Sequence, residues 1–187
     1  GEYRRCIIQG NEAVGVFNTG DGSGGAYSAY LYDCLIADNS SVWAGGGGAR
    51  SCTLVGCTIA GNVGKVAGAY ACTIKNSVLW DNNSSVDGVV SLKNYDDGSA
   101  SKITWSCTTP AVADANSISV DPNFVGTQDE NRYKLGFGSP CVGKGNISLV
   151  VSATDVIGAP RIMNGTVELG CYEYDSSGEA PDRLEII

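Results

Sequence analysis

The sequence contains no histidine, only 5 prolines, and few charged residues, which make up 17% of its 187 positions. Without an imidazole, the chain cannot form any histidine-dependent catalytic triad, and it lacks the commonest zinc ligand. The long runs of alanine, leucine, glutamate and lysine that are typical of helical proteins are missing as well. These absences argue against both a helical bundle and a histidine-based active site.

Positive charge is also scarce. The 12 lysines and arginines face 20 aspartates and glutamates, so the formal net charge is −8. No basic run is present that could neutralise the phosphates of a nucleic acid, and we therefore expect no nucleic-acid partner. No apolar stretch approaches the roughly 18 residues that suggest a membrane helix, so no membrane span is expected either.

Glycine is abundant, with 26 residues, and 43% of the chain is hydrophobic. Valine, isoleucine, threonine, serine and asparagine are frequent, which predicts many short strands joined by tight turns. The chain is long enough to bury one sizeable core.

An internal repeat organises the first half of the chain. Four segments align without gaps and begin at Cys6, Cys34, Cys57 and Ser77. Each ends in an asparagine, and a glycine-alanine pair precedes each of the last three at an equivalent position, in residues 25–26, 48–49 and 68–69. A unit of about 20 residues cannot bury an apolar face alone, but stacked units can, so the repeat predicts coils wound above one another.

Stacked coils bring equivalent residues into ladders that run along the axis. Alanine, leucine and isoleucine positions are expected to fill the interior. The asparagine ladder is expected to line a turn, where asparagine tolerates the left-handed conformation and bonds neighbouring backbone. Cysteines form two further ladders, which we interpret as buried, reduced thiols. These three ladders are Asn11, Asn39, Asn62 and Asn82; Cys6, Cys34 and Cys57; and Cys52 and Cys72.

The stretch that begins with four glycines and Ala49, at residues 45–49, and ends at Asn62 resembles the repeat of pectin-lyase-like surface proteins. The later part resembles the ending of bacterial "choice-of-anchor Q" domain proteins. That second resemblance is carried by residues 121–125, 133–135, 138–141, 155–161 and 168–174.

The resemblance implies an all-β fold, namely a single-stranded right-handed parallel β-helix with an irregular C-terminal cap. It also implies a secreted or cell-surface location in a bacterium. We expect coils over residues 1–109 that continue upstream of this chain, a β-helix continuation and cap over residues 110–174, and a polar tail over residues 175–187. A monomer is expected. Cys141 and Cys171 lie in the cap, outside the ladders, and are the favoured disulfide if the chain forms one.

Two groups of residues could bind a ligand. Tyr27, Arg50 and Tyr70 align in three successive coils, and Trp80 occupies another outward position. Exposed aromatic rings and a guanidinium suit sugar stacking and hydrogen bonding, although such rings also cover the sides of a solenoid or pack beneath loops. Asp96 and Asp97 precede a glycine and indicate a turn, with a calcium site as the alternative. No other cofactor is expected.

No catalytic cluster is identifiable, so three functions remain open. The favoured one is a non-catalytic β-helix that binds glycans or other extracellular partners. The alternatives are a fragment of a polysaccharide lyase or glycoside hydrolase, and a structural stalk. The acidic composition disfavours tight binding of anionic polyuronates.

Overall fold

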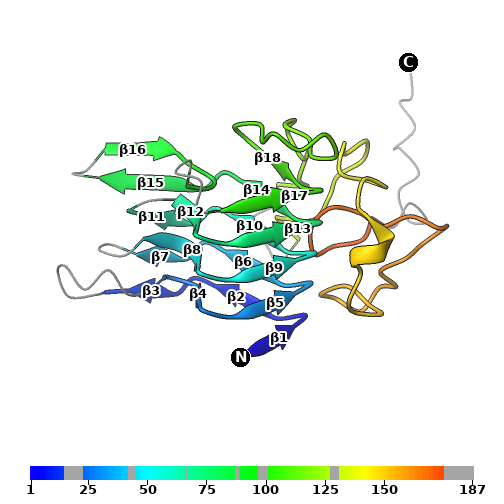
Figure 1. Ribbon diagram of the computed structural model, residues 1–187, viewed down its shortest axis with the longest axis horizontal. Helices are drawn as coiled ribbons and strands as arrows, with labels where there is room; N and C mark the ends of the chain where they lie inside the picture. Colours follow the sequence, from blue (N-terminus) through cyan, green and yellow to red (C-terminus); the bar gives the residue numbers. More distant parts are fainter. Residues whose placement is uncertain are drawn as a thin grey trace, which may run out of the picture.

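A computed structural model of the chain describes residues 1–14, 23–41, 45–65, 67–86, 89–96, 101–126 and 131–174. In these residues the chain forms short β-strands and one turn of 3-10 helix, η1 (Ile147–Leu149). Figure 1 shows the strands stacked above one another, with the N-terminal coil at the bottom. The fold is all-β with almost no helix, as the composition predicts.

Successive coils place their strands in four sheets in turn. Sheet A contains β1 (Glu2–Arg4), β5 (Tyr30–Tyr32), β9 (Thr53–Val55), β13 (Thr73–Lys75) and β17 (Lys102–Thr104). Sheet B contains β2 (Ile7–Gln9), β6 (Leu35–Ala37), β10 (Thr58–Ala60), β14 (Val78–Trp80) and β18 (Cys107–Thr108). Sheet C contains β3 (Glu12–Ala13), β7 (Ser40–Ser41), β11 (Val63–Gly64), β15 (Asn83–Val86) and β16 (Val89–Leu92). Sheet D contains β4 (Ala26–Tyr27), β8 (Gly46–Arg50) and β12 (Ala67–Tyr70).

The pairing of the strands follows the alignment of the repeats. Ile36 on β6 pairs with Ile8 below it and with Ile59 above it, and both pairs are parallel. The exception is β16, which folds back antiparallel on β15 in the fourth coil. Beyond this hairpin Tyr95 bridges Ala69, so the chain rejoins the stack above sheet D. The parallel, solenoid-like stack that the repeat predicts is therefore confirmed.

The interior is filled by apolar ladders from sheets A, B and D. Because side chains alternate along a strand, the middle residues of the strands in sheets A and B point inward. Six of them have no exposed surface: Leu31, Ile36, Leu54, Ile59, Ile74 and Leu79. Burying each such side chain contributes about 1.5–3 kcal/mol, and this burial is what holds the coils together.

The asparagine ladder runs through the bend between sheets B and C. The side-chain oxygen of Asn62 accepts hydrogen bonds from the backbone N–H (3.0 Å) and the side-chain amide (2.9 Å) of Asn39. Asn82 accepts the same two bonds from Asn62, at 3.0 and 2.8 Å. Asn94 continues the ladder by accepting from Asn82, at 3.0 Å in each case. The sequence repeat misses Asn94, because the β15–β16 hairpin changes the spacing.

The left-handed residue of this bend is the one before each asparagine. Asp38 and Asp81 have φ of 53°, and Gly61 has φ of 65°, whereas the ladder asparagines do not have positive φ. The prediction that the asparagines themselves adopt this conformation is wrong, because their side chains turn into the core. The glycines of the repeat make room for them: a Cβ on Gly48 would lie 2.9 Å from the side chain of Asn62.

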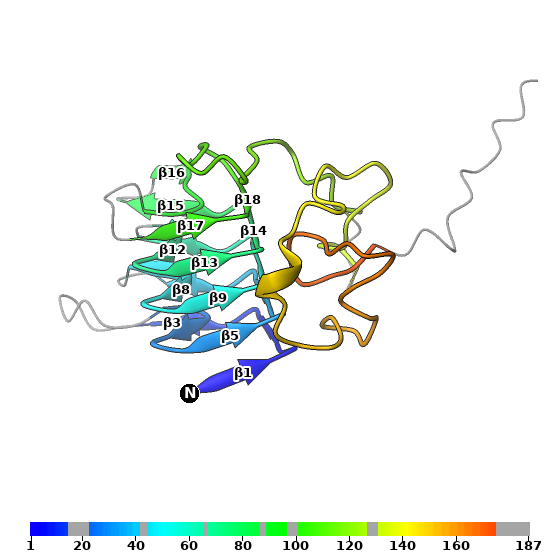
Figure 2. The same ribbon diagram turned by 45° about the vertical axis from the view of Figure 1, so that its right-hand side comes forward.

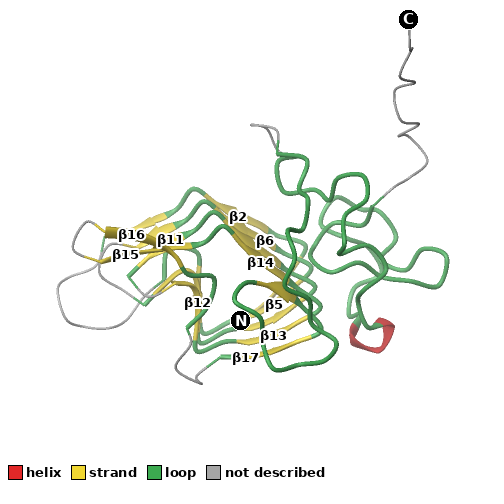
Figure 3. Cartoon of the chain, turned by 90° about the horizontal axis from the view of Figure 1, so that it is seen from above, coloured by secondary structure: helices red, strands yellow, loops and turns green. Residues whose placement is uncertain are grey.

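The C-terminal region, residues 121–126 and 131–174, lies beside the coil stack. Figures 2 and 3 show its loops along the flank formed by sheet B. Its apolar residues, among them Tyr133, Leu135, Leu169 and Tyr172, pack on outward-facing residues of that sheet. The sequence predicts a β-helix continuation and cap over the longer range of residues 110–174. In its described part the C-terminal region contains isolated bridges and η1, but no further extended strand.

Residues 112–118, which lie within the range predicted for the cap, pass over the C-terminal end of the core. Val112 and Tyr95 pack against the interior cluster. The backbone N–H of Ile118 donates to Ser106 (2.9 Å), so the chain turns across the last coil before it descends along sheet B.

All eight cysteines are free thiols. The predicted ladders exist: the backbone N–H of Cys6 donates to the sulfur of Cys34, and that of Cys52 to the sulfur of Cys72, both at 3.4 Å. The favoured disulfide between Cys141 and Cys171 does not form, since the two residues belong to different apolar clusters.

Candidate functional site

Tyr27, Arg50 and Tyr70 lie above one another on the outer face of sheet D. Tyr27 on β4 pairs with Arg50 on β8, which pairs with Tyr70 on β12. The guanidinium carbon of Arg50 lies 5.9 Å from the ring centroid of Tyr27 and 5.4 Å from that of Tyr70. These are cation–π distances, so the arginine joins the two rings into one stack. We call these three residues the tyrosine-arginine stripe.

The local sequence explains why the stripe faces outward. In each strand the preceding residue is an alanine that points into the core, so the next side chain points away from it. Ala49 and Ala69 have no exposed surface, and Ala26 is nearly buried. Glycine supports the stripe as well, because a Cβ on Gly45 would lie 3.3 Å from the ring of Tyr70. The ring of Tyr70 therefore packs directly on the backbone of Gly45.

Exposure within the stripe is uneven. Tyr27 is 51% exposed, whereas Arg50 and Tyr70 are half-buried. A ligand would therefore meet the ring of Tyr27 and the outer edges of the other two side chains. The stack holds these groups in fixed positions, which reduces the entropy lost when a ligand binds.

Trp80 does not join the stripe. It lies on β14 in sheet B and packs half-buried against the cluster that contains Leu135 and Leu169 of the C-terminal region. Its position is outward from the coil, as predicted, but the C-terminal region covers that face. Trp80 therefore packs beneath a later segment of the chain, which is the alternative that the sequence left open. In this position Trp80 is unsuited to contact a glycan.

Asp96 follows Tyr95 and stands next to Tyr70 in the stack. It is 5% exposed, and its Oδ1 accepts hydrogen bonds from the backbone N–H of Ala71 (3.1 Å) and from the hydroxyl of Ser101. These hydrogen bonds hold the segment that follows β16 in place above sheet D. Asp97 lies outside the described residues. Across the described ranges, no three histidine, cysteine, aspartate or glutamate side chains come together as metal ligands.

The structure also brings together a polar group that the sequence does not reveal. The hydroxyl of Tyr133 donates to Asp38 Oδ1 (2.5 Å), and Arg132 approaches the same oxygen at 3.4 Å. Burial and the Asp38 carboxylate raise the pKa of Tyr133. Gly61 provides the space, because a side chain there would collide with both partners. These residues are 95 positions apart without any periodic relation, so no sequence signal joins them.

A second such group is fully buried between the coil stack and the C-terminal region. Arg161, 1% exposed, pairs with Asp33 at 3.1 Å and with Glu173. Burial, together with a hydrogen bond to Glu168, raises the pKa of Glu173 to about 9. Burial also raises the pKa of Asp33. Asp155 accepts a hydrogen bond from the backbone N–H of Glu173 (3.0 Å), and the raised pKa of Glu173 means that its carboxyl group retains a proton at neutral pH.

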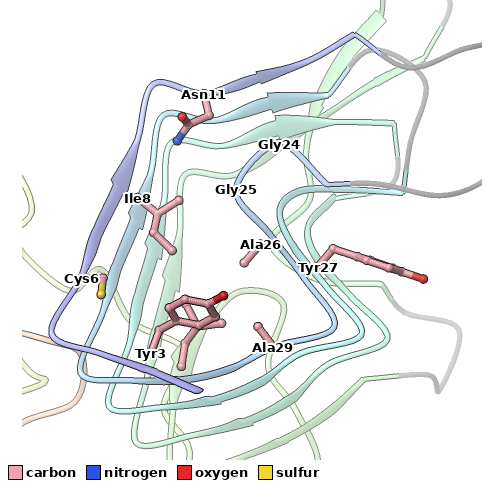
Figure 4. Close-up of a pocket in the computed structure, with 10 residues that line it drawn as sticks. Tyr3, Cys6, Ile8, Asn11, Gly24, Gly25, Ala26, Tyr27 and Ala29 are labelled. Atoms are coloured by element: carbon pink, nitrogen blue, oxygen red, sulfur yellow. The ribbon is translucent and has the colours of Figure 1, made fainter. Parts of the chain in front are cut away.

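The N-terminal end of the stack holds a pocket of about 480 Å³. Figure 4 shows the ring of Tyr3 over it, while the ring of Tyr27 points away. Cys6, Ile8 and Leu31 line the pocket, and they are members of the interior ladders. The pocket is therefore the open end of the core.

Comparison with protein-family models finds no match, and comparison with curated proteins finds none either. In the portion of the chain with described structure, no helix is both long and apolar enough to cross a bilayer. The candidate site is therefore identified from its geometry alone, and the tyrosine-arginine stripe is its centre.

Proposed function

We propose that the chain is part of a secreted or cell-surface right-handed parallel β-helix of the pectin-lyase-like kind, which binds glycans through the tyrosine-arginine stripe. The observation that carries the binding function is the ordered stack of Tyr27, Arg50 and Tyr70 on an outer sheet. The proposed fold is supported by the regular order of strands through sheets A, B, C and D. The proposed location follows from the resemblance of the sequence to bacterial surface proteins.

The chemistry of the stripe suits a sugar ring. The C–H face of a pyranose packs on an exposed aromatic ring, and its hydroxyl groups accept hydrogen bonds from a guanidinium. Neighbouring strands lie about 4.8 Å apart, so the stripe offers these groups at a regular spacing along the axis. The net charge of −8 repels polyuronates, so the expected ligands are neutral glycans.

The test is binding to an array of neutral and acidic polysaccharides, followed by affinity measurement on the best neutral ligand. Tyr27→Ala should weaken that affinity about tenfold, which is ~1.4 kcal/mol. Tyr30→Ala is the matched control, because Tyr30 is 55% exposed but lies on sheet A, outside the stripe. Tyr30→Ala should leave the affinity unchanged.

Other outcomes would replace the proposal. Equal losses in the two variants would show that the stripe is not the site, and failure to bind any polysaccharide would favour a structural stalk. New reducing ends or an unsaturated product in the same incubation would favour a glycoside hydrolase or a polysaccharide lyase.

A further inference from the structure

Cys107 and Cys141 face each other across the boundary between the coil stack and the C-terminal region. Cys107 pairs with Val78 in sheet B, so its side chain points outward from the last coil. Cys141 reaches the same place from the C-terminal region. Neither residue has exposed surface, and both pack in one apolar cluster with Leu135 and Leu169. Their thiols share a side-chain hydrogen bond.

This pair differs from the cysteine ladders. Cys52 and Cys72 occupy equivalent positions of adjacent coils, so their side chains project in parallel. A disulfide requires a Cβ–S–S–Cβ dihedral angle near 90°, which parallel, in-register side chains do not reach without moving the backbone. Cys107 and Cys141 approach from opposite sides of an interface, on segments that are not paired strands, so no such register constrains them.

We infer that Cys107 and Cys141 are a disulfide-forming pair, which in an oxidising compartment fastens the C-terminal region to the coil stack. The hydrogen bond from Cys141 lowers the pKa of Cys107, which favours its thiolate as the attacking group. With oxidised glutathione, this thiolate attacks one sulfur of the reagent and releases the first reduced glutathione. The Cys141 thiolate then displaces the second, so two thiols lose two protons and two electrons.

The pair is shielded from solvent in the folded chain, so the reaction belongs to folding or to transient opening of the C-terminal region. Once formed, the bond removes conformations from the unfolded state by closing the loop between the two residues. A bond of this kind is expected to raise the thermal midpoint of a chain of this size by roughly 5–15 °C. This inference is independent of glycan binding, and either can fail without the other.

The test folds the whole chain in oxidised and reduced glutathione, then alkylates it under denaturing conditions and maps the peptides. We expect six alkylated cysteines, a single cross-linked peptide pair that joins Cys107 to Cys141, and a midpoint that falls when a reductant is added. Eight alkylated cysteines, or a cross-link between ladder residues such as Cys52 and Cys72, would overturn the inference.

Two double variants provide the comparison. Cys107→Ser with Cys141→Ser should remove the effect of the reductant on the midpoint. A serine at position 107 retains a donor for the carbonyl of Val120, which Cys107 contacts at 3.2 Å. Cys52→Ser with Cys72→Ser should keep the reductant effect, and its disappearance there would assign the bond to the ladder. Peptide mapping of the unaltered chain decides the matter even if a variant does not fold.

Discussion

The coil stack and the C-terminal region are held by different kinds of contact. In the stack, successive coils repeat the backbone ladders, the apolar interior and, through most of the coils, the asparagine bonds of their neighbours. The C-terminal region instead depends on a few side-chain groups that occur once, such as Arg161 with Asp33 and Tyr133 with Asp38. When one contact of a ladder is lost, the equivalent contacts of the neighbouring coils remain. When a contact that occurs only once is lost, no equivalent contact remains. Substitutions should therefore act locally in the stack and more broadly in the C-terminal region.

The largest expected effect comes from Arg161→Met. It leaves the buried carboxyl group of Asp33 without its cation and that of Glu173 without a hydrogen-bond donor, and breaking a buried pair in this way costs about 3–5 kcal/mol. Denaturant unfolding measures the loss, and hydrogen exchange should show faster exchange in the C-terminal region than in the coils.

Arg4→Ala is the control for this change. Arg4 pairs with Glu2 at the surface, where the two side chains are 44% and 52% exposed, and its loss should cost at most about 1 kcal/mol. Equal effects of the two substitutions would contradict the role given to the buried group.

Within the stack, Asn62→Ala should cost about 3 kcal/mol. The change removes the acceptor for two hydrogen bonds from Asn39 and leaves buried donors unpaired. Asn83→Ala is matched to it, since the amide of Asn83 makes one bond (3.3 Å) to the carbonyl of Asp81, and its loss should cost less than about 1 kcal/mol. A small effect at Asn62 would show that the asparagine ladder does not stabilise the coils.

Stability should also depend on pH. The pKa of Glu173 is about 9 in the folded chain and close to an ordinary carboxyl value in the unfolded chain. The folded state therefore holds a proton that the unfolded state has lost. The stabilisation is complete below the ordinary carboxyl pKa and decreases as the pH rises toward 9. The thermal midpoint should fall from pH 5 to pH 9.

Glu173→Gln tests the origin of that dependence. Glutamine keeps a hydrogen-bonding side chain beside Arg161 but does not titrate in this range, so the midpoint of the variant should change less between the two pH values. An unchanged slope would assign the dependence to other groups, of which Asp33 is the first candidate.

The same contrast explains what the sequence could predict. Ile36, Ile59 and Asn62 recur at equivalent places of the repeat, so their inward positions and their pairing follow from alignment alone. The outward direction of the tyrosine-arginine stripe follows from the alternation of side chains along a strand. Periodicity can be read from the sequence itself, and in the stack the residues at equivalent positions of successive repeats become neighbours.

No pattern in the sequence indicates the contacts of the C-terminal region. Tyr133 meets Asp38, Arg161 meets Asp33 and Cys141 meets Cys107 because of how the chain folds back along sheet B, and no spacing relates these pairs. For the same reason the sequence placed Trp80 on an open surface and paired Cys141 with Cys171. Asn94 does not fit the spacing of the repeat, because the β15–β16 hairpin shortens its distance to Asn82 to 12 residues.

The most direct test of the stacked arrangement is nuclear magnetic resonance of the asparagine side chains. If successive coils lie in register, the side-chain amide protons of Asn39 should show contacts to Asn62, those of Asn62 should show contacts to Asn82, and all should exchange slowly with solvent. Rapidly exchanging amides without cross-peaks between these residues would contradict the account, because asparagines 20 and 23 positions apart would then not be neighbours.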